Sequence, residues 1–425
     1  MRVVVIGAGA AGLVCARTLL RAGVSNVTVL EASDGVGGRV RSDVVDGFTL
    51  DRGFQVLFTA YPAAKRQLDY RRLDLRSFTP GAIIAQGDRR HILSDPARDP
   101  AALAPSVLTS IVPLADKLRT ARFSTEMRAT SVQAMMNRRD ETTEDFLRRS
   151  HFSDRFIDNF IRPFFGGIFL DRTLQTSAKA FQFDWKMLSE GETVVPARGM
   201  GQIGWQLAEE LMASGCVLLR TKAESLEFDG GGRCEGVRST EEEIFPADAV
   251  VVATPAPEAA RLTGKPMPVG QVSTVNLYFA GDAPVYRGRK ILLHANRSPF
   301  VNNAAQITNV ALEYAPPGKH LLSATVLGIT EFPDEILFAK SISDLRRMFA
   351  GDKAALAALE TYRPLALYRI PYAQFAQPPG VYPTLPDNDS GIPGLFFAGE
   401  FTAASSLNAA LRSGEKCAAH LLAVG

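Results

Sequence analysis

Cysteine and histidine are scarce in this chain of 425 residues. The sequence has four cysteines and five histidines, and no two cysteines stand at the spacing of a metal-binding or redox CxxC motif. The histidines are scattered and form no cluster. These absences argue against a metal site, so we expect none. They also favour free thiols and a reducing compartment.

An excess of charge of one sign and a long apolar run are also lacking. The chain has 47 Lys and Arg against 45 Asp and Glu, for a net charge of +2, which gives no reason to expect nucleic acid as a partner. No apolar stretch reaches the roughly 20 residues of a membrane-spanning helix. The apolar start, MRVVVIGAGAAGLVCARTLL, carries three regularly spaced glycines, which argue against a signal peptide. We therefore expect a cytoplasmic protein.

The first 31 residues contain a nucleotide-binding pattern. Residues 2–6, RVVVI, are typical of a buried parallel strand, and the glycine motif of residues 7–12, GAGAAG, leads into an apolar helix. A second strand, VTVLE, ends at Glu31. A strand, GxGxxG, a helix, a strand and an acid within about 30 residues are the parts of a dinucleotide-binding βαβ unit.

Each conspicuous residue of this pattern has a physical role. Gly7 allows the tight turn, Gly9 lets the backbone approach a pyrophosphate, and Gly12 lets the helix pack on the strand. The helix N-terminus offers free N–H groups and a partial positive charge to the phosphates. Glu31 can accept hydrogen bonds from the adenosine ribose.

A second glycine-rich loop follows at Gly37, Gly38 and Arg39. In its order of GxGxxG, Glu and GGR, the chain resembles the flavin-containing amine oxidase superfamily, which includes amine oxidases, protoporphyrinogen oxidases and phytoene-type desaturases. The resemblance implies FAD, with the GGR loop near the pyrophosphate. No Cys or His precedes the AGE motif at Ala398–Glu400, so we expect non-covalent FAD, and no second GxGxxG unit is present for NAD.

The C-terminal stretch FFAGE, followed by SLNAALRSGEKCAA, resembles the family's second flavin motif. By analogy Glu400 bonds the ribityl chain, and the Gly399–Glu400 backbone lies by the pyrophosphate. A helix that starts near Leu407 points its N-terminus at the flavin N1/O2 edge, where helix N–H groups stabilise the negative charge of the reduced ring.

A middle block completes the resemblance. Residues 199–215 are typical of a glycine turn and an amphipathic helix, residues 217–228 of a strand, and residues 235–256 of a hairpin that feeds a buried strand. The resemblance places Gly53, Phe54 and Gln55 close to the isoalloxazine ring and the backbone of Ala223 against the adenine. The expected cofactor-binding residues are Gly7, Gly9, Ala11, Gly12, Glu31, Ala32, Gly37, Gly38, Arg39, Gly53, Phe54, Ala223, Thr254, Gly399, Glu400, Leu407 and Asn408.

These motifs predict an α/β fold, namely a two-domain flavoprotein with a Rossmann-like FAD-binding domain and a mixed α+β substrate domain. The FAD-binding domain is expected in three parts, residues 1–60, 196–265 and 390–425. The substrate domain is expected in two parts, a helix-rich 61–195 and 266–389.

The substrate domain allows two interpretations at each of two places. Phe152, Phe156 and Phe160 recur every four residues and share one helix face; they are either core or the wall of an apolar tunnel, and Phe164, Phe165 and Phe169 follow them. Paired arginines between residues 61 and 155 are either a solvated helical surface or a docking face for an anionic membrane.

The expected activity is removal of a hydride from a substrate C–H to flavin N5, leaving a new C=C or C=N, with oxygen or a quinone as electron acceptor. Asn276 and Ser406, aligned by eye, replace a Lys and a Tyr of amine oxidases. They favour a bulky apolar substrate, polyprenoid or tetrapyrrole, over an amine. The alternatives are an amine oxidase, an FAD-dependent isomerase without net oxidation, and a prenyl-lipid-binding chaperone without flavin. No catalytic residue is assigned.

Overall fold

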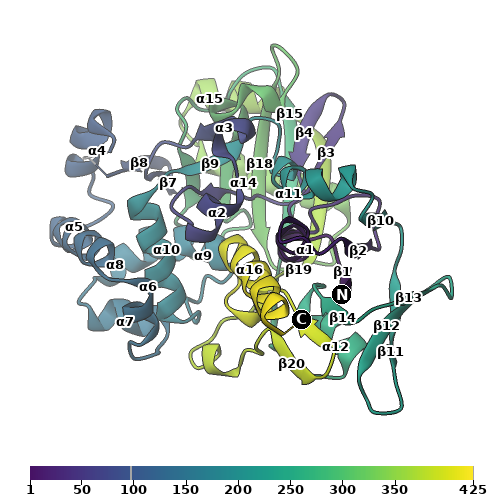
Figure 1. The fold of residues 1–425 in the computed structure, drawn as a ribbon. Coiled ribbons are helices and arrows are strands. Elements are labelled where there is room, and N and C mark those ends of the chain that lie inside the picture. The colour runs from purple at the N-terminus through teal and green to yellow at the C-terminus, as the bar shows by residue number, and fades with distance from the viewer. Residues whose placement is uncertain (96–97, 425) are drawn as a thin grey trace.

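The structure is a computed structural model that describes residues 1–95 and 98–424. Residues 96, 97 and 425, which fall in the expected segments 61–195 and 390–425, lie outside the described residues. Figure 1 shows two sheets near the centre, a group of helices on the left and a β-ribbon that projects on the right.

One sheet has six strands in the order β10-β2-β1-β14-β21-β20. All neighbouring pairs are parallel except β20 with β21. The central strands are buried and continuously apolar because helices cover the sheet. Their bounds are β1 (Arg2–Ile6), β2 (Asn26–Glu31), β10 (Val217–Leu219), β14 (Ala249–Val252), β20 (Asp389–Ile392) and β21 (Leu395–Phe397).

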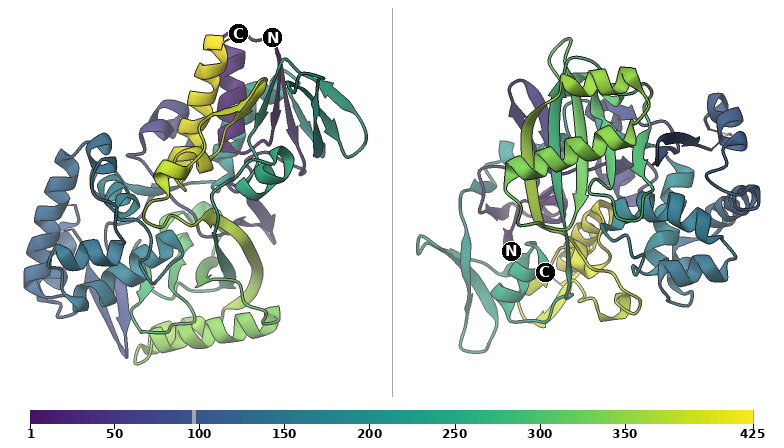
Figure 2. Two further views of the ribbon diagram at one scale, coloured as in Figure 1. Left: turned by 90° about the horizontal axis from the view of Figure 1, so that it is seen from below. Right: turned by 180° about the vertical axis from the view of Figure 1, so that it is seen from behind.

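Three helices pack beside this sheet: α1 (Ala10–Arg21), α11 (Gly201–Ala213) and α16 (Leu407–Val424). The left view of Figure 2 shows α16 beside α1, with both chain termini at the same end. The two helices touch at Gly414, where a Cβ atom would lie 2.4 Å from the Ala11 carbonyl oxygen. This close approach joins the first and last parts of the chain.

The other large sheet has seven strands in the order β19-β15-β18-β17-β16-β7-β8. It is antiparallel except between β16 and β7. Helices α14 (Asp334–Met348) and α15 (Lys353–Glu360) pack on one face, and α14 crosses the sheet in the right view of Figure 2. The strands are β7 (Ala82–Gln86), β8 (Arg89–Leu93), β15 (Gln271–Gly281), β16 (Ile291–His294), β17 (Asn303–Gln306), β18 (His320–Leu327) and β19 (Arg363–Phe375).

The group of helices comes from the first insert. A π-helical turn, η2, continues α8 into α9, and the phenylalanines along this path contact one another at ring-centroid distances of 4.9–5.6 Å from Phe152 to Phe164. The helices are α4 (Leu103–Leu108), α5 (Leu114–Ala129), α6 (Val132–Met136), α7 (Thr143–Arg149), α8 (Asp154–Phe156), η2 (Ile157–Ile161), α9 (Arg162–Phe169) and α10 (Ala178–Glu190).

Smaller elements connect these layers. They are β3 (Ser42–Val45), β4 (Phe48–Asp51), β5 (Leu57–Phe58), β6 (Leu75–Ser77), β9 (Thr193–Pro196), β11 (Ala223–Phe228), β12 (Cys234–Ser239), β13 (Ile244–Pro246), α2 (Pro62–Gln67), α3 (Tyr70–Leu73), α12 (Ala256–Thr263) and α13 (Ile307–Val310). Short 3-10 turns are η1 (Pro100–Ala102), η3 (Leu312–Tyr314), η4 (Tyr382–Thr384) and η5 (Glu400–Thr402).

The structure confirms the two N-terminal strands and the helix that begins at Leu407. The single strand expected over residues 217–228 is wrong. Arg220 has a left-handed backbone with φ +58°, so the chain turns there, and β10 and β11 enter different sheets. The first insert, expected to be helix-rich, also contains the strands β6, β7 and β8. These strands are short and lie next to Pro and Gly, so their apolar residues show no clear alternation that would indicate a strand.

The paired arginines are largely engaged in surface ion pairs. Arg72 lies 2.9 Å from Glu209, Arg90 lies 3.2 Å from Asp352, and Arg138 lies 2.9 Å from Glu126. Such pairs contribute little stability at a surface but satisfy the charge. They fit the solvated-surface interpretation at these positions.

Candidate functional site

A cavity of about 1340 Å³ runs from the glycine motif of the six-stranded sheet to the helices of the first insert. Ligand pockets usually hold about 300–1,000 Å³, so this cavity has room for a large cofactor and a substrate together. One half is lined by the motif residues and the other by aromatic side chains.

The glycine motif forms a cradle at the start of α1. Gly7 has φ +107°, which L side chains rarely adopt, and a Cβ atom on Gly12 would lie 2.1 Å from the Gly7 carbonyl oxygen. Gly9 differs, because a Cβ atom there would meet nothing within 4 Å. Gly9 is also the N-cap of α1, and no side chain of the described residues caps it. Gly9 therefore opens on free space at a helix N-terminus suited to a pyrophosphate.

Glu31 lies at the end of β2 and lines the same part of the cavity. Its Oε2 accepts a hydrogen bond from the Ala8 N–H at 2.8 Å, and its Oε1 accepts from the N–H and the hydroxyl of Ser33 at 2.9 and 2.6 Å. These bonds fix the carboxylate at the edge of the sheet, where it can receive a ribose hydroxyl.

The GGR loop and the AGE motif meet across this half of the cavity. Arg39 Nη1 lies 2.6 Å from Glu400 Oε1 and donates a hydrogen bond to the Ala373 carbonyl oxygen at 2.9 Å. The Arg39 guanidinium also lies over the Tyr372 ring, 5.5 Å from its centroid. Burial of Arg39 lowers its pKa, but the charge and the hydrogen bond of the neighbouring Glu400 carboxylate together have the larger effect. The pKa of Arg39 is therefore raised above its ordinary value.

The N-terminus of α16 closes the cavity on the opposite side. Ser405, Ser406 and Leu407 line it, and the Ser406 hydroxyl accepts a hydrogen bond from the Ala409 N–H at 3.1 Å. Ser405 Oγ donates to Glu400 Oε2 at 3.2 Å. The helix N-terminus therefore presents its partial positive charge to the cavity beside an ordered carboxylate.

This half of the cavity fits an FAD molecule. Gly9 leaves open space at the helix N-terminus, and the lining residue Thr254 has a buried hydroxyl oxygen without a hydrogen-bond partner among the described residues. An adenine dinucleotide would fill the open space at Gly9 and can form a hydrogen bond with the Thr254 hydroxyl. No cysteine or histidine among the described residues lines the cavity. Non-covalent binding of FAD stays a prediction.

The structure brings most of the expected cofactor residues to this one cavity. Two of them do not line it. Gly12 packs against Gly7, as its expected role requires, and Asn408 turns away, because its Oδ1 accepts a hydrogen bond from the Ala63 N–H at 2.9 Å. The residues that line the cavity are Gly7, Gly9, Ala11, Glu31, Ala32, Gly37, Gly38, Arg39, Gly53, Phe54, Ala223, Thr254, Gly399, Glu400 and Leu407.

The other half is an aromatic chamber formed by Phe54, Phe160, Phe164, Phe165, Phe169 and Trp185. Phe165 and Trp185 stack at 5.7 Å with an angle of 9° between their rings. Phe152 packs on Phe156 but does not line the cavity. The phenylalanine run therefore serves both purposes, with Phe152 in the core and the later rings on the chamber wall.

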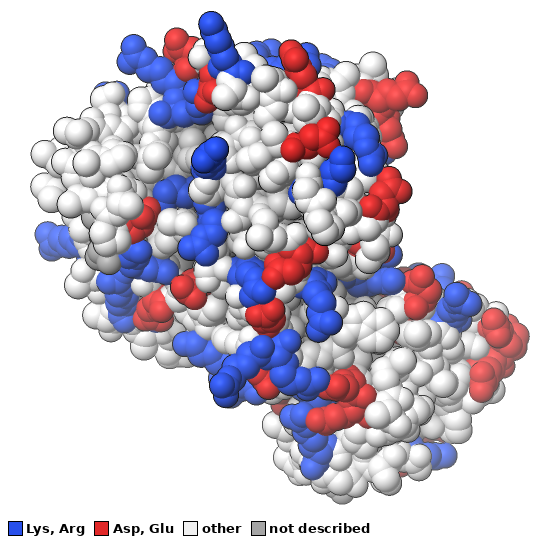
Figure 3. All heavy atoms as spheres, turned by 90° about the horizontal axis from the view of Figure 1, so that it is seen from above, with Lys and Arg blue, Asp and Glu red and all other residues white. Residues whose placement is uncertain are grey.

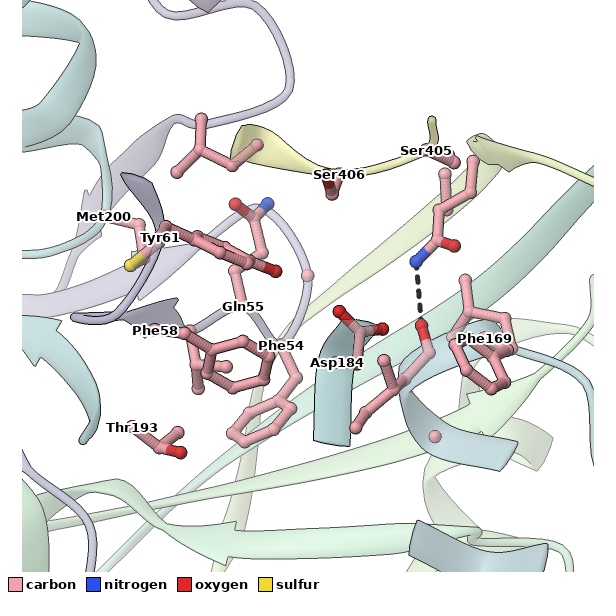
Figure 4. Close-up of a pocket in the computed structure, with 18 of the residues that line it drawn as sticks. Phe54, Gln55, Phe58, Tyr61, Phe169, Asp184, Thr193, Met200, Ser405 and Ser406 are labelled. Carbon is pink, nitrogen blue, oxygen red and sulfur yellow. Dashed lines mark hydrogen bonds between the residues drawn. The ribbon is translucent and has the colours of Figure 1, made fainter. Parts of the chain in front are cut away.

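Asp184 is a chamber residue that the sequence interpretation missed. Its carboxyl group points into the space between Tyr61 and Phe169 in Figure 4. The side chain is 8% exposed, and burial raises its pKa to about 7. The available signal was a lone acid between aromatic residues, in the stretch AFQFDWKM.

Asn276 lies elsewhere than the alignment by eye suggests. It is fully buried in β15, where its Oδ1 accepts hydrogen bonds from Ser323 and Thr325, and it does not line the cavity. The residue of β15 that does line it is Thr274. The absence of Lys at position 276 therefore carries no argument about the substrate.

Neither a metal centre nor a membrane span is found in the described part of the chain. Within residues 1–95 and 98–424, no group of three His, Cys, Asp or Glu residues could hold a metal ion. Over the same residues, no helix has both the length and the apolar character needed to cross a bilayer.

Comparison with known proteins adds independent findings. The family model "Flavin containing amine oxidoreductase" matches residues 10–422. A protoporphyrinogen oxidase of Arabidopsis thaliana is 31% identical over 39% of this chain and 32% of its own length. A 15-cis-phytoene desaturase of Synechococcus elongatus is 23% identical over 100% of this chain and 96% of its own. A putative protoporphyrinogen oxidase from Exiguobacterium has a similar structure, with a TM-score of 0.76 and 19% identity over 100% of this chain and 99% of that one.

Proposed function

The chain belongs to the flavin-containing amine oxidoreductase family and is an FAD-dependent oxidoreductase, and we propose that it oxidises a C–H bond of a bulky, largely apolar substrate. The observation that carries the proposal is the aromatic chamber, which continues directly from the cofactor half of the cavity. Asp184, on α10, also lines this chamber, and its carboxyl group points into it (Figure 4).

FAD, when bound, supplies the acceptor for a hydride from the substrate. The chain's own residues bind and orient the two molecules. Gly9 and the α1 N-terminus receive the pyrophosphate, Glu31 the ribose, and the α16 N-terminus at Leu407 stabilises negative charge at the far end of the cofactor. Catalysis on this account is orientation and charge stabilisation rather than acid–base chemistry by a triad.

The chamber supports an apolar substrate by its composition and packing. Phe54 and Phe164 are partly exposed and line the chamber, and burial of such apolar surface by a ligand contributes about 25 cal/mol per Å². A polyprenoid and a tetrapyrrole both offer this surface. Exclusion of water from the chamber also protects the reacting bond and strengthens the electrostatic interactions around it.

A substrate of this kind partitions into membranes, and we propose that the α4–α5 face contacts an anionic bilayer. Leu108, Leu114 and Leu118 are 80%, 63% and 66% exposed, and Leu114 and Leu118 line the cavity mouth. The exposed Arg122 lies on the same helix. In Figure 3 the upper left part of the surface, on the side where Figure 1 places α4 and α5, is mostly white, and charged side chains border it below.

The test is anaerobic reduction of the bound flavin. The purified protein is mixed with simple amines, linear and cyclic polyenes, and a porphyrinogen, and the absorption of oxidised flavin is followed. Bleaching by a polyene or the porphyrinogen, with no bleaching by simple amines, is expected. Efficient turnover of a simple amine alone overturns the proposed substrate class. A product of unchanged mass would instead indicate an isomerase. A protein that retains no FAD would indicate a lipid-binding chaperone. Reoxidation by oxygen and by a quinone then identifies the electron acceptor.

A further inference from the structure

Asp184 is a buried carboxylic acid without a partner. It lies on α10, lines the cavity and is 8% exposed, yet no described residue gives its side chain a hydrogen bond or an ion pair. The other buried polar residues of the same helix are satisfied: Gln182 bonds the Ala178 carbonyl oxygen, and Lys186 bonds Glu190. Asp184 is therefore an exception on its own helix.

The groups that face Asp184 do not neutralise it. The titratable groups whose charge couples to it are Tyr61, at the start of α2, and Tyr382, in η4. Burial raises the pKa of both phenols above the ordinary value, so both stay neutral. Arg98, which lines the same cavity, donates to the carbonyl oxygens of Leu188 and Gly191, and Lys186, on the same helix, is paired with Glu190.

A carboxylate in such a place costs free energy in the empty protein. Buried charges are normally paired or hydrogen-bonded, because their hydration is lost. The carboxyl oxygens of Asp184 are not sealed inside the protein, since they face the cavity (Figure 4). Since no described residue supplies a partner, we expect the partner to come from what enters the chamber.

We propose that Asp184 receives a nitrogen hydrogen-bond donor of the substrate, an ammonium or a ring N–H, carried on an apolar body. This inference rests on the proposed function and sharpens it, because it separates nitrogen-bearing substrates from pure hydrocarbons such as polyenes. A nitrogen donor satisfies the carboxylate that the chamber leaves unpaired, and the aromatic walls bury the rest of the molecule. An anionic substrate group at this position is disfavoured by the same carboxylate.

The test measures binding to the FAD-loaded protein rather than turnover. The probes are naphthylmethylamine, methylnaphthalene and naphthoate, which share an aromatic body and differ in one polar group. Binding is measured by equilibrium dialysis against the FAD-loaded protein, because naphthalene fluoresces in the same range as tryptophan and would mask the signal of Trp185 in the chamber.

The expected result is that the amine binds at least tenfold more tightly than methylnaphthalene, and naphthoate most weakly. The preference for the amine increases between about pH 6 and about pH 8, as the carboxyl group loses its proton. Asp184→Asn keeps the side-chain volume and is expected to abolish the preference, with binding of methylnaphthalene and the flavin content unchanged.

Equal affinities of the amine and the hydrocarbon for the unsubstituted chamber would overturn the inference, as would a preference that survives in Asp184→Asn. If that variant does not fold, the absence of the pH-dependent preference in the parent protein overturns it equally. The proposed function is tested by a different measurement, namely bleaching of the flavin by a substrate. Binding of these probes does not require bleaching, so the two proposals can fail independently.

Discussion

Arg39 and Glu400 form an ion pair although 361 residues separate them. The Nη1 and Oε1 atoms lie 2.6 Å apart, and the Glu400 side chain is only 8% exposed. Their pairing joins the loop after β2 to the turn after β21, at the point where both reach the cavity. The site thus depends on a contact between the first and last segments of the chain.

Glu400→Gln is expected to weaken FAD binding at least tenfold, because the Glu400 carboxylate, whose side chain is only 8% exposed, holds the Arg39 guanidinium in place beside the cavity. FAD retained after gel filtration and its dissociation constant are the measurements. Glu209→Gln is the matched control, since it breaks the Arg72–Glu209 pair, whose side chains are 57% and 56% exposed. Equal FAD retention in both variants would contradict the role of the pair.

Replacement of Gly9 by alanine is expected to weaken FAD binding, whereas replacement of Gly12 by alanine is expected to destabilise the fold. The new methyl group at Gly9 meets nothing in the protein within 4 Å, and φ is −77°, so the fold is retained while the space for the pyrophosphate is filled. At Gly12 the methyl group would lie 2.1 Å from the Gly7 carbonyl oxygen. Gly9→Ala should therefore keep the apoprotein's thermal unfolding midpoint and lose FAD affinity, whereas Gly12→Ala should lower the midpoint. A destabilised Gly9→Ala apoprotein would refute this division.

Asp184 makes stability depend on pH with a definite sign. Its pKa is raised from 3.8 to about 7 by burial, so the folded state binds the proton more strongly than the unfolded state. This contribution to the free energy of unfolding is complete below about pH 4 and is lost as pH rises through about 7. The loss is on the order of 4 kcal/mol at most, since one pKa unit corresponds to about 1.4 kcal/mol.

Asp184→Asn removes this loss, so it should raise the unfolding midpoint at about pH 8 by clearly more than at about pH 5, where only part of the loss has occurred. Asp51 provides the contrast. Its pKa is raised to about 6 by burial, but its carboxylate accepts hydrogen bonds from Ser42, Met200 and Tyr314. Asp51→Asn should therefore destabilise the protein at both pH values. An Asp184→Asn protein with the parent's pH dependence would show that Asp184 is already ionised at low pH.

The cofactor half of the site was predictable from sequence because its requirements are local. Gly7 and Gly9 are dictated by backbone geometry within one turn, and Glu31 by the end of the adjoining strand. Arg39 and Glu400 could each be placed by their motifs, but not their mutual contact, which depends on how distant segments pack. A local pattern specifies a strand–turn–helix unit, while side-chain partners across the chain are decided by tertiary structure.

The chamber was less predictable for the same reason. A phenylalanine every four residues indicates a shared helix face but not what that face meets, so Phe152 and Phe160 read alike although one is core and the other lines the cavity. Asn408 does not line the cavity, since a residue at a helix start can turn toward either side, and its side chain accepts a hydrogen bond from the Ala63 N–H. Asp184 gave a weak signal because burial of a single acid cannot be read from its neighbours alone.

The α4–α5 face provides the last prediction. Leu114 and Leu118 line the cavity and are exposed, as is Leu108 on the neighbouring α4, so insertion of these side chains into a bilayer would place the cavity against the source of an apolar substrate. The protein should co-sediment with vesicles that contain anionic lipid, and the double substitution Leu108→Glu with Leu118→Glu should reduce the bound fraction at least fivefold by adding charge repulsion and removing apolar area. Val269→Glu is the matched control, because Val269 is 87% exposed outside this face and its change should have no effect. FAD content and the unfolding midpoint should stay unchanged in all three proteins, since these side chains are exposed. Equal sedimentation of the double variant and the control would place any membrane contact elsewhere on the surface.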